Sequence, residues 1–359
     1  MIDALLEQAL PRLEATATTA ATPFDAIVLA AGAGRRLSPV TDELCKPLVP
    51  VLGTPLLWWA VAALRAAGVG RVAMNAHHHG QQVAAAGAVL AGRDGVDVVV
   101  VPEDAPTGPA GGARACAAVL PARTSHVVLS GDAWTDVDLG ALVDEHVARG
   151  SDLTICATPV PDPSRFGVLT LDGDDVVGHR EKPQDAAPGA LASCGIYVLS
   201  DAGLRALAAG GADLADYDFT HVVPVLRGLG LTVRASVTSR AWDDVGTVAA
   251  LLRANVDALR ADRLVRVAVP HPGAPGLWTT GVPDLAADVR CSGTVHVGPG
   301  AVVGPGTHLR ATTVGARAVV GSGARLDGCV VLPGARVPDG FTATGEVLGA
   351  TRVASEVLA

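Results

Sequence analysis

The chain has 359 residues and carries 27 basic and 36 acidic side chains, so its formal net charge is −9. This length is sufficient for two domains, each with its own hydrophobic core. The acidic balance and the lack of a long basic run argue against nucleic-acid binding, because phosphate contacts need a basic surface.

The mean hydropathy of +0.38 comes from alanine and valine, and no apolar run reaches the roughly 20 residues of a membrane-spanning helix, so no membrane association is expected. The six cysteines are scattered and form no CxxC pair, so the sequence predicts neither a zinc site nor a disulfide framework. Reduced thiols indicate a cytoplasmic protein. Residues 1–23, which lack the features of a signal peptide, are expected to form an N-terminal extension. It would hold a short amphipathic helix and a flexible Ala/Thr linker, or be poorly ordered throughout.

From Asp25 onwards, short apolar runs alternate with segments of helical spacing. Strands are predicted in "DAIVLA", "RVAMNA", "VDVVVVP" and "SHVVLSGD", and helices in "PLLWWAVAALRAAG", "GQQVAAAGAVLAG" and "AGGARACAAVL". Such alternation predicts a mostly parallel sheet with helices on both faces, and ligands beyond the carboxyl ends of the strands. Strands dominate from Ser151 to Val245, and a helix around "TVAALLRANVDALRAD" closes a domain that we place at residues 24–265.

A linker is predicted at 266–284, followed by a repeat region at 285–340 and a tail at 341–359. In the repeat region, aliphatic residues or cysteine recur every six residues, with a spacing of five at two places. They are Leu285, Cys291, Val297, Val303, Leu309, Val314, Val320, Leu326, Leu332 and Val337. One inward residue per hexad, often followed by glycine, is typical of a parallel β-helix, and about three coils would fit in this region. Open ends of a β-helix favour self-association, so we expect a homo-oligomer.

The segment "LAAGAGRRLSPVTDELCKPLVPV" joins a glycine turn to two arginines and a Lys-Pro pair. Glycines after a strand allow backbone N–H groups to approach phosphate closely. A dinucleotide-binding fold is one interpretation, but the third glycine of GxGxxG is missing and a Pro-rich loop follows instead of a helix. The alternative is a nucleoside triphosphate in the loop, with Arg36 and Lys46 balancing its charge.

This segment resembles the signature of the sugar-1-phosphate nucleotidylyltransferases, in which G-x-G-x-R-L-x-P-x-T precedes Lys-Pro. Four further segments resemble motifs of that family in the same order: "TGPAGGARA", "SGDAWTD", "FGVL…REKP" and "AWDDVGT". The resemblance covers residues 25 to about 340. It implies a Rossmann-like nucleotidyltransferase domain with a mixed α/β sheet, followed by a short β-helix. The chain is most similar to mannose-1-phosphate guanylyltransferase-type members with a C-terminal left-handed β-helix.

The resemblance also implies roles for individual residues. The triphosphate would be approached by the loop of Ala31, Gly32 and Gly34 and neutralised by Arg36 and Lys46, while Gly108 would lie near the base. Asp132 and Asp244 would hold Mg²⁺, which prefers carboxylate oxygens. Lys182 would contact the phosphate of the sugar phosphate and Glu181 the sugar hydroxyls. Gly167 and Gly195 would line the sugar pocket. Catalysis by Arg36, Lys46, Asp132, Lys182 and Asp244 would then depend on positioning and charge neutralisation, without a protein nucleophile.

Three residues depart from the family pattern. Arg35 stands where a small Thr or Ser is usual, Pro109 replaces a Thr near the base, and Ser193 stands where Asn often occurs. These changes bear on triphosphate, base and sugar recognition respectively. The run His77-His78-His79 is interpreted as structural, because adjacent histidines cannot all face one ion. His296 and His308 in the repeats are not expected to form a second, acyltransferase-type site.

The resulting hypothesis is an enzyme that condenses an NTP, with GTP favoured, with a sugar-1-phosphate or similar cyclic polyol phosphate. Its products would be an NDP-sugar and pyrophosphate. A member that uses UTP or dTTP is one alternative. A non-catalytic protein that senses sugar nucleotides is another, although such a protein would be free to lose the charged residues that are present here.

Overall fold

The computed structural model describes the chain except for residues 10, 13–17, 93–95, 212–215, 350–351 and 355–359. It divides into two compact units. The sheet unit comprises Glu14–Gly32 and Ala63–Asp243, and the β-helix unit comprises Met1–Leu13, Ala33–Ala62 and Asp244–Ala359. Helix α3 (Leu56–Ala66) therefore begins in one unit and ends in the other. No helix in the described ranges is both long and apolar enough to cross a membrane.

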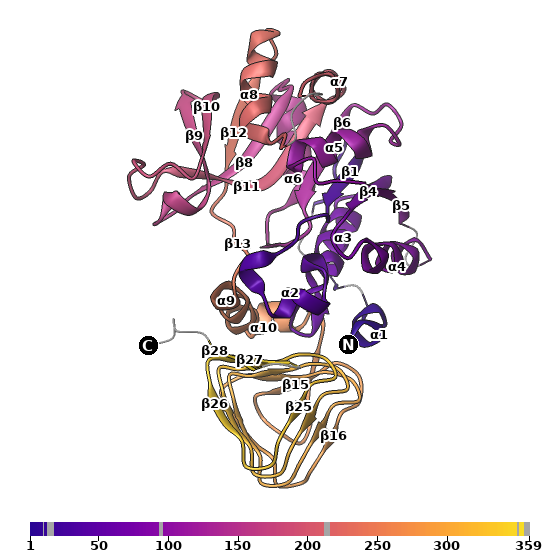
Figure 1. The fold of residues 1–359 in the computed structure, drawn as a ribbon, viewed down its shortest axis with the longest axis vertical. Coiled ribbons are helices and arrows are strands. Elements are labelled where there is room, and N and C mark those ends of the chain that lie inside the picture. The colour runs from indigo at the N-terminus through magenta and orange to yellow at the C-terminus, as the bar shows by residue number, and fades with distance from the viewer. Residues whose placement is uncertain (10, 13–17, 93–95, 212–215, 350–351, 355–359) are drawn as a thin grey trace. The chain divides into compact units, whose positions relative to one another are not determined.

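The sheet unit is built on one mixed sheet, which has nine strands in the described residues. Its spatial order is β5 (Asp97–Pro102), β4 (Arg71–Ala76), β1 (Phe24–Leu29), β6 (Ser125–Ser130), β11 (Leu191–Ser200), β8 (Leu153–Pro159), β12 (Val233–Val237), β10 (Asp175–Glu181) and β9 (Gly167–Asp172) (Figure 1). The first four strands run parallel, as the strand–helix alternation predicts, and β11 is inserted antiparallel between β6 and β8. The predicted mixed α/β fold is thus confirmed.

Three helices of this unit share one hydrophobic core with the sheet: α5 (Pro109–Ala117), α7 (Asp201–Ala209) and α8 (Phe219–Gly228). That core buries Ala110 and Cys116 of α5, Leu207 of α7 and Val222 of α8 against strand residues such as Ile27. Helix α4 (Gly80–Ala91) packs on β4 and β5, and α6 (Leu139–Ala148) packs on β6, β8 and β11. A short strand β7 (Ala133–Thr135) follows β6, and β13 (Trp242–Asp244) ends where the β-helix unit begins.

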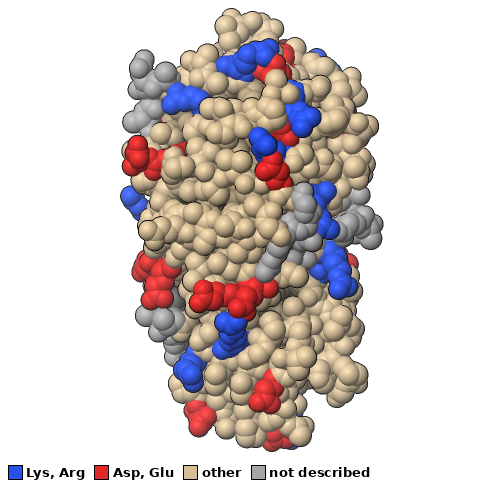
Figure 2. Space-filling model, turned by 90° about the vertical axis from the view of Figure 1, so that its right-hand side faces the viewer, with Lys and Arg blue, Asp and Glu red and all other residues tan. Residues whose placement is uncertain are grey.

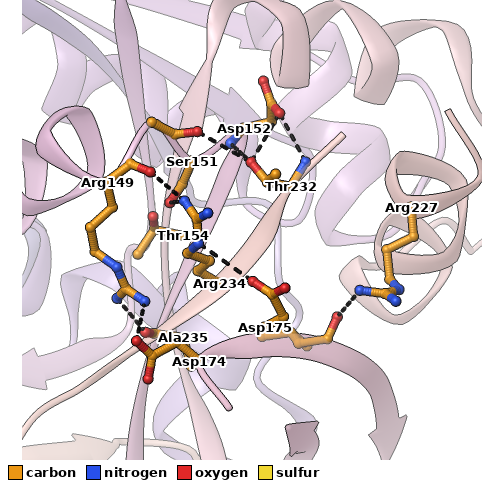
Figure 3. Close-up of polar contacts among 12 residues, drawn as sticks. Arg149, Ser151, Asp152, Thr154, Asp174, Asp175, Arg227, Thr232, Arg234 and Ala235 are labelled. Carbon is orange, nitrogen blue, oxygen red and sulfur yellow. Dashed lines mark hydrogen bonds and ion pairs between the residues drawn. The ribbon is translucent and has the colours of Figure 1, made fainter. Parts of the chain in front are cut away.

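A polar network fixes the end of the β9–β10 hairpin to the rest of the sheet unit (Figure 3). Arg149 Nη2 lies 2.9 Å from Asp174 Oδ2, and Arg234 Nε lies 3.4 Å from Asp175 Oδ1. Arg227 Nη1 of α8 donates to the Val176 carbonyl at 3.3 Å. These contacts hold the turn of the hairpin and the beginning of β10.

The β-helix unit contains three parallel sheets that stack coil upon coil (Figure 1). Leu285, Val303, Val320 and Val337 are Cα partners in successive strands of one sheet. The strands are β15 (Leu277–Thr279), β16 (Asp284–Leu285), β17 (Arg290–Ser292), β18 (Val295–Val297), β19 (Val302–Val303), β20 (His308–Arg310), β21 (Thr313–Val314), β22 (Val319–Val320), β23 (Arg325–Asp327), β24 (Val330–Val331), β25 (Arg336–Val337), β26 (Thr342–Thr344) and β27 (Glu346–Leu348). The predicted parallel β-helix is therefore confirmed.

Two details differ from the expectation. Val331, and not Leu332, pairs with Val314 and Leu348 in the ladder, because the second five-residue step lies between Leu326 and Val331, one repeat earlier than predicted. Strands of the helix extend on both sides of 285–340, so two of the sheets contain four strands in the described residues and more than the expected three coils form. β14 (Val269–Pro270) and β28 (Arg352–Ala354) pair antiparallel with the end strands β15 and β27, which satisfies backbone groups there.

The N-terminal segment is packed rather than poorly ordered where it is described. Helix α1 (Ile2–Leu6) buries Ala4 and Leu5 within the β-helix unit, and Trp58 Nε1 donates to the Gln8 carbonyl at 2.8 Å. In the sheet unit, the Thr18 N–H donates to Asp138 Oδ2 at 3.1 Å and the Ala21 N–H to Asp144 Oδ1 at 2.9 Å. The Ala/Thr stretch is therefore hydrogen-bonded from Thr18 onwards, and residues 13–17 of the predicted linker lie outside the described residues.

Within the β-helix unit, short elements surround the signature segment: α2 (Val40–Glu43), β2 (Pro50–Val51), β3 (Thr54–Pro55), α9 (Val248–Ala258) and α10 (Ala261–Leu264). Asn255 of α9 clamps the β2–β3 hairpin, because its Oδ1 accepts from the Leu52 N–H at 3.0 Å and its Nδ2 donates to the Pro50 carbonyl at 3.2 Å. A helix at the end of the predicted domain thus fixes the turn that follows the Lys-Pro pair.

His296 joins the same hairpin to the β-helix. The His296 side chain on β18 is 1% exposed, and a Cβ added at Gly53 would lie 3.3 Å from its Cε1. Its Nε2 lies 2.8 Å from Thr280 Oγ1, which itself donates to the Val267 carbonyl at 3.0 Å, so Nε2 carries the proton. Burial lowers the pKa of His296 to about 4.

This burial makes stability depend on pH. The pKa of His296 is about 4 in the folded chain and 6.5 ordinarily, so its contribution is fully present above pH 6.5 and is lost as pH falls from 6.5 towards 4. Urea unfolding should show a loss of about 2 kcal/mol from this residue between pH 6.5 and 5. His296→Gln, which keeps a donor for Thr280, should lose less over that interval. Burial also lowers the pKa of His146 to about 4, so the unfolding free energy of the variant should still fall somewhat over this pH interval. An unchanged slope in the variant would contradict the assignment.

Candidate active site

The signature segment places two cations on one carboxylate within the β-helix unit. Lys46 Nζ lies 3.2 Å from Asp244 Oδ1, and Arg36 Nη2 lies 3.5 Å from Asp244 Oδ2. The Lys46 side chain is 10% exposed and that of Arg36 is 55% exposed, so the lysine is the buried member of the cluster. A Cβ at Gly246 would lie 3.0 Å from Asp244 Oδ2, which shows that glycine leaves room for the ion pairs. Sequence analysis predicted all three charged residues, and the structure brings them together.

The two glycines of the loop have different local requirements. Gly34 has a φ of +64°, and a Cβ there would lie 2.9 Å from Thr41 Cγ2, so both conformation and space require glycine. A Cβ at Gly32 would meet nothing within 4 Å, and Ala31 beside it is partly exposed. Packing within the chain therefore does not explain Gly32, whereas the approach of a ligand to the backbone would.

In the sheet unit, a polar chain links the end of β1 to the loop after β5. The Ala30 N–H donates to Asn75 Oδ1 at 2.7 Å, and Asn75 Nδ2 donates to Glu103 Oε1 at 3.1 Å. A Cβ at Gly112 would lie 2.2 Å from Asn75 Nδ2, so this glycine is required by the asparagine. The network orients the Glu103 carboxylate beyond the carboxyl end of β5, where ligands of such sheets bind.

Gly108 lies beside this network and has a φ of +79°. A Cβ there would lie 2.5 Å from the Tyr217 carbonyl oxygen, which accepts hydrogen bonds from the Ala110 N–H at 2.9 Å and the Gly111 N–H at 3.2 Å. Pro109 occupies the first turn of α5, where an N–H has no partner within the helix. Proline at position 109 thus removes no hydrogen bond of the helix. The next two N–H groups, of Ala110 and Gly111, already donate to the Tyr217 carbonyl.

The carboxyl end of β6 lies beside Gly195 of β11, and Asp132 comes two residues after this strand. Asp132 follows Ser130 and Gly131, and the Gly131 N–H donates to the Leu29 carbonyl at 2.9 Å. Gly195 has a φ of +65°, and a Cβ there would lie 2.7 Å from Ser130 Oγ. The Gly195 N–H also donates to Ser193 Oγ at 3.3 Å. The hydroxyl of Ser193, the third departure from the family pattern, is thus part of the chain's own hydrogen bonding.

The segment "FGVL…REKP" forms the β9–β10 hairpin, in which Gly167 and Glu181 are partners. Glu181 Oε1 and Lys182 Nζ form an ion pair, and about half of each side chain is exposed. Lys182 has a φ of +45°, which is unusual for a residue with a side chain. Strained conformations of this kind cluster at functional sites. A Cβ at Gly167 would lie 2.5 Å from His179 Nε2 and 3.2 Å from Glu181 Oε2, so the space over Gly167 is filled by His179.

Other candidate side chains are engaged within the chain. His77 Nδ1 lies 2.9 Å from the Glu103 carbonyl, whereas His79 has a φ of +51° at the start of α4. Burial raises the pKa of the Cys45 thiol to about 12, so Cys45 beside Lys46 is a neutral packing residue. Charges of both signs lie interspersed among uncharged residues on the face that Figure 2 shows.

The comparisons with known proteins agree with this geometry. Residues 25–261 match the family model described as nucleotidyl transferase. The chain belongs to the nucleotidyl transferase family. This nucleotidyl transferase is 31% identical over 322 residues to the mannose-1-phosphate guanylyltransferase of Mycobacterium tuberculosis, which covers 88% of this chain and 82% of the relative. It is also 31% identical over 314 residues to the glucose-1-phosphate thymidylyltransferase of Streptomyces griseus, covering 86% and 81%.

Among solved structures, it resembles a candidate glucose-1-phosphate thymidylyltransferase from Bacillus anthracis, crystallised with sucrose. The TM-score is 0.57 at 25% identity, and the match covers 66% of this chain and 95% of the other. The names of these relatives include two different nucleotides, so the family alone leaves the base to be determined.

Sequence reasoning missed Asn75, Glu103 and His179. Asn75 was visible as an amide inside the apolar strand "RVAMNA", and Glu103 as the first charge after "VDVVVVP". His179 lies inside a recognised segment but has no counterpart in its motif. The structure was needed to find these three. A side chain at Gly112, which is distant in sequence, would collide with Asn75 and Glu103, and a side chain at Gly167, which lies across the β9–β10 hairpin, would collide with His179.

Gly108 allows a sharp test of the base segment. Gly108→Ala places a Cβ at a positive φ and against the Tyr217 backbone, whereas Gly150→Ala has a similar φ of +58° and meets nothing within 4 Å. Both changes should cost about 1 kcal/mol or more for the backbone conformation. Only Gly108→Ala should additionally weaken nucleotide binding, measured by calorimetry, by about tenfold or more because α5 must shift. Equal nucleotide affinity in the two variants would show that this segment does not contact the nucleotide.

Proposed function

We propose that this nucleotidyl transferase condenses an NTP with a sugar-1-phosphate, or a similar cyclic polyol phosphate, to give an NDP-sugar and pyrophosphate. The observation that carries the proposal is the cluster of Arg36 and Lys46 on Asp244, held in a glycine loop with open space over Gly32. Such a loop offers a polyphosphate two cations and free backbone approach. The relatives' names and the exposed Glu181–Lys182 pair support a sugar phosphate as the second substrate.

The chemistry is a direct displacement. A phosphate oxygen of the sugar phosphate attacks the α-phosphorus of the NTP, the new P–O bond forms, the bond to the β-phosphate oxygen breaks, and pyrophosphate leaves. Arg36 and Lys46 neutralise the triphosphate and the leaving pyrophosphate, Lys182 orients the attacking phosphate, and Glu181 accepts hydrogen bonds from sugar hydroxyls. Positioning and electrostatic stabilisation supply most of the catalysis in reactions of this type.

The residues fit Mg²⁺ as the cofactor. Asp132 and Asp244 offer carboxylate oxygens, the donors that Mg²⁺ takes, and both side chains are partly exposed. Asp244 now balances Lys46 and Arg36, and it would become available to a cation when these two bind phosphate. When bound, Mg²⁺ would supply further neutralisation of the phosphate oxygens.

We propose GTP as the nucleotide, and Glu103 supports this choice. A carboxylate only accepts hydrogen bonds, and guanine presents N1–H and an exocyclic amine, whereas uracil and thymine present one N–H between two carbonyls. Asn75 Nδ2 and Thr107 Oγ1 donate to Glu103 Oε1 at 3.1 and 3.4 Å, which fixes the carboxylate. The alternatives are UTP or dTTP in the same reaction, and a sensor that binds a sugar nucleotide without turnover.

One panel separates these possibilities. Four NTPs and dTTP are each combined with several sugar-1-phosphates, and pyrophosphate release is measured with Mg²⁺ present. We expect turnover, highest with GTP. Turnover that is highest with UTP or dTTP would overturn the choice of base alone. A sensor would bind an NDP-sugar in calorimetry and release no pyrophosphate with any pair.

Asp132→Asn and Asp244→Asn should each lower kcat by roughly 10²-fold or more, because each removes a charge that positions the cation where phosphate charge develops. The matched control is Asp243→Asn, beside Asp244, which should remain near the wild-type rate. Thermal unfolding of each variant checks the fold. Near-normal rates for either of the first two at saturating Mg²⁺ would refute their assignment.

Glu103→Gln should change the base preference. The glutamine amide offers one donor and one acceptor, so it loses a partner for guanine and gains one for a pyrimidine carbonyl. The ratio of kcat/KM for GTP to that for UTP should fall by about tenfold or more. Asp104→Asn, at the exposed neighbouring position, is the control and should leave the ratio unchanged. The same ratio in Glu103→Gln and wild type would show that Glu103 does not contact the base.

A further inference from the structure

His179 is a partly buried side chain with both ring nitrogens buried, and the mechanism above has no use for it. Neither ring nitrogen, although buried, has a hydrogen-bond partner among the described residues. Burial lowers the pKa of His179, so the ring is neutral at neutral pH and carries one N–H. The nearby Phe219 backbone acts to raise the pKa of His179, but its geometry relative to the ring is not that of a hydrogen bond. Buried polar groups are nearly always paired, so an unpaired ring requires an explanation.

A backbone irregularity in β10 affects the direction of the His179 ring. Strand β10 has a bulge between Val176 and Gly178, immediately before His179. Bulges re-aim side chains and are common beside active sites. Arg227 Nη1 donates to the carbonyl of Val176, the first residue of the bulge, at 3.3 Å. The ring position is therefore determined by α8 as well as by the hairpin.

His179 and Glu181 project from the same face of β10, since side chains alternate along a strand. Their atoms Nε2 and Oε2 lie 2.5 and 3.2 Å from one point, the position that a Cβ at residue 167 would take. Gly167 thus removes a side chain that would separate the two groups. The imidazole and the carboxylate can meet over the glycine by a small rotation of the exposed Glu181 side chain.

Glu181 currently takes its hydrogen bond from Lys182, through its other oxygen. The same lysine would be needed by the phosphate of the second substrate, and Glu181 would then lose its cation. We propose that His179 is a positioning residue, whose Nε2–H holds the Glu181 carboxylate once Lys182 has turned to that phosphate. The inference depends on the proposed function, because it assigns Glu181 to the sugar hydroxyls.

The test compares two substitutions. His179→Leu fills a similar volume without a donor, whereas the side-chain amide of His179→Gln can donate from near the Nε2 position. His179→Leu should raise KM for the preferred sugar phosphate about tenfold, with kcat and the KM for the NTP nearly unchanged, because a binding contact is lost. His179→Gln should restore most of the affinity. Asp172→Asn, at an exposed position of the paired strand β9, is the control.

A Glu181→Ala background shows whether His179 acts through the carboxylate. There, His179→Leu should weaken sugar-phosphate binding less than twofold, since coupled residues are non-additive. Calorimetric binding of the sugar phosphate replaces KM if turnover is too low. The proposal is overturned by a normal KM in His179→Leu, by equal loss in the Gln and Leu variants, or by the same loss with and without Glu181. If the wild type turns over no sugar phosphate, the proposed function itself fails, which the substrate panel detects separately.

Discussion

A buried lysine that needs a carboxylate constrains the β-helix unit. Lys46 is 8% exposed as a residue, and its ammonium group depends on Asp244, which lies 198 positions later in the chain. Removing one partner of such a pair costs about 3–5 kcal/mol because the other charge is left buried. The signature segment is therefore bound to the last residue of β13. Asn255 reinforces this connection at the β2–β3 hairpin, and His296 extends it to the β-helix.

The same ion pair prepares the loop for a polyphosphate. Two cations without a counter-charge would repel each other, and Arg36 would lose its preferred position. With Asp244 present, both are already gathered beside Gly34 before a ligand arrives, so less ordering is needed on binding. The more exposed partner, Arg36, is the one that can exchange carboxylate for phosphate at the lower cost in desolvation. Preorganised charge of this kind is most effective when the chemistry requires no protein nucleophile.

Periodic features of the fold were predictable from the sequence, and non-local pairings were not. The local spacing of apolar residues was sufficient to predict strands β1, β4 and β5 and the hexad repeats. The insertion of β11 between β6 and β8, the bulge in β10 and the docking of α1 depend on distant partners that no pattern names. The predicted charged residues, such as Lys46 and Asp244, were found because they stand in segments that resemble motifs of the family. Glu103 also follows an apolar strand but lies outside those segments, and His179 has no counterpart in its motif, so both were missed.

The motif glycines show why such residues were harder to find. A glycine in a binding motif is usually taken as room for the ligand, and Gly32 agrees with that interpretation. Gly108, Gly112 and Gly167 do not, because the missing side chains would collide with the Tyr217 carbonyl, Asn75 and His179 of the chain itself. Each of these glycines therefore makes room for a polar group of the chain itself. A motif glycine can thus identify a polar neighbour close enough to orient the groups that contact the substrate.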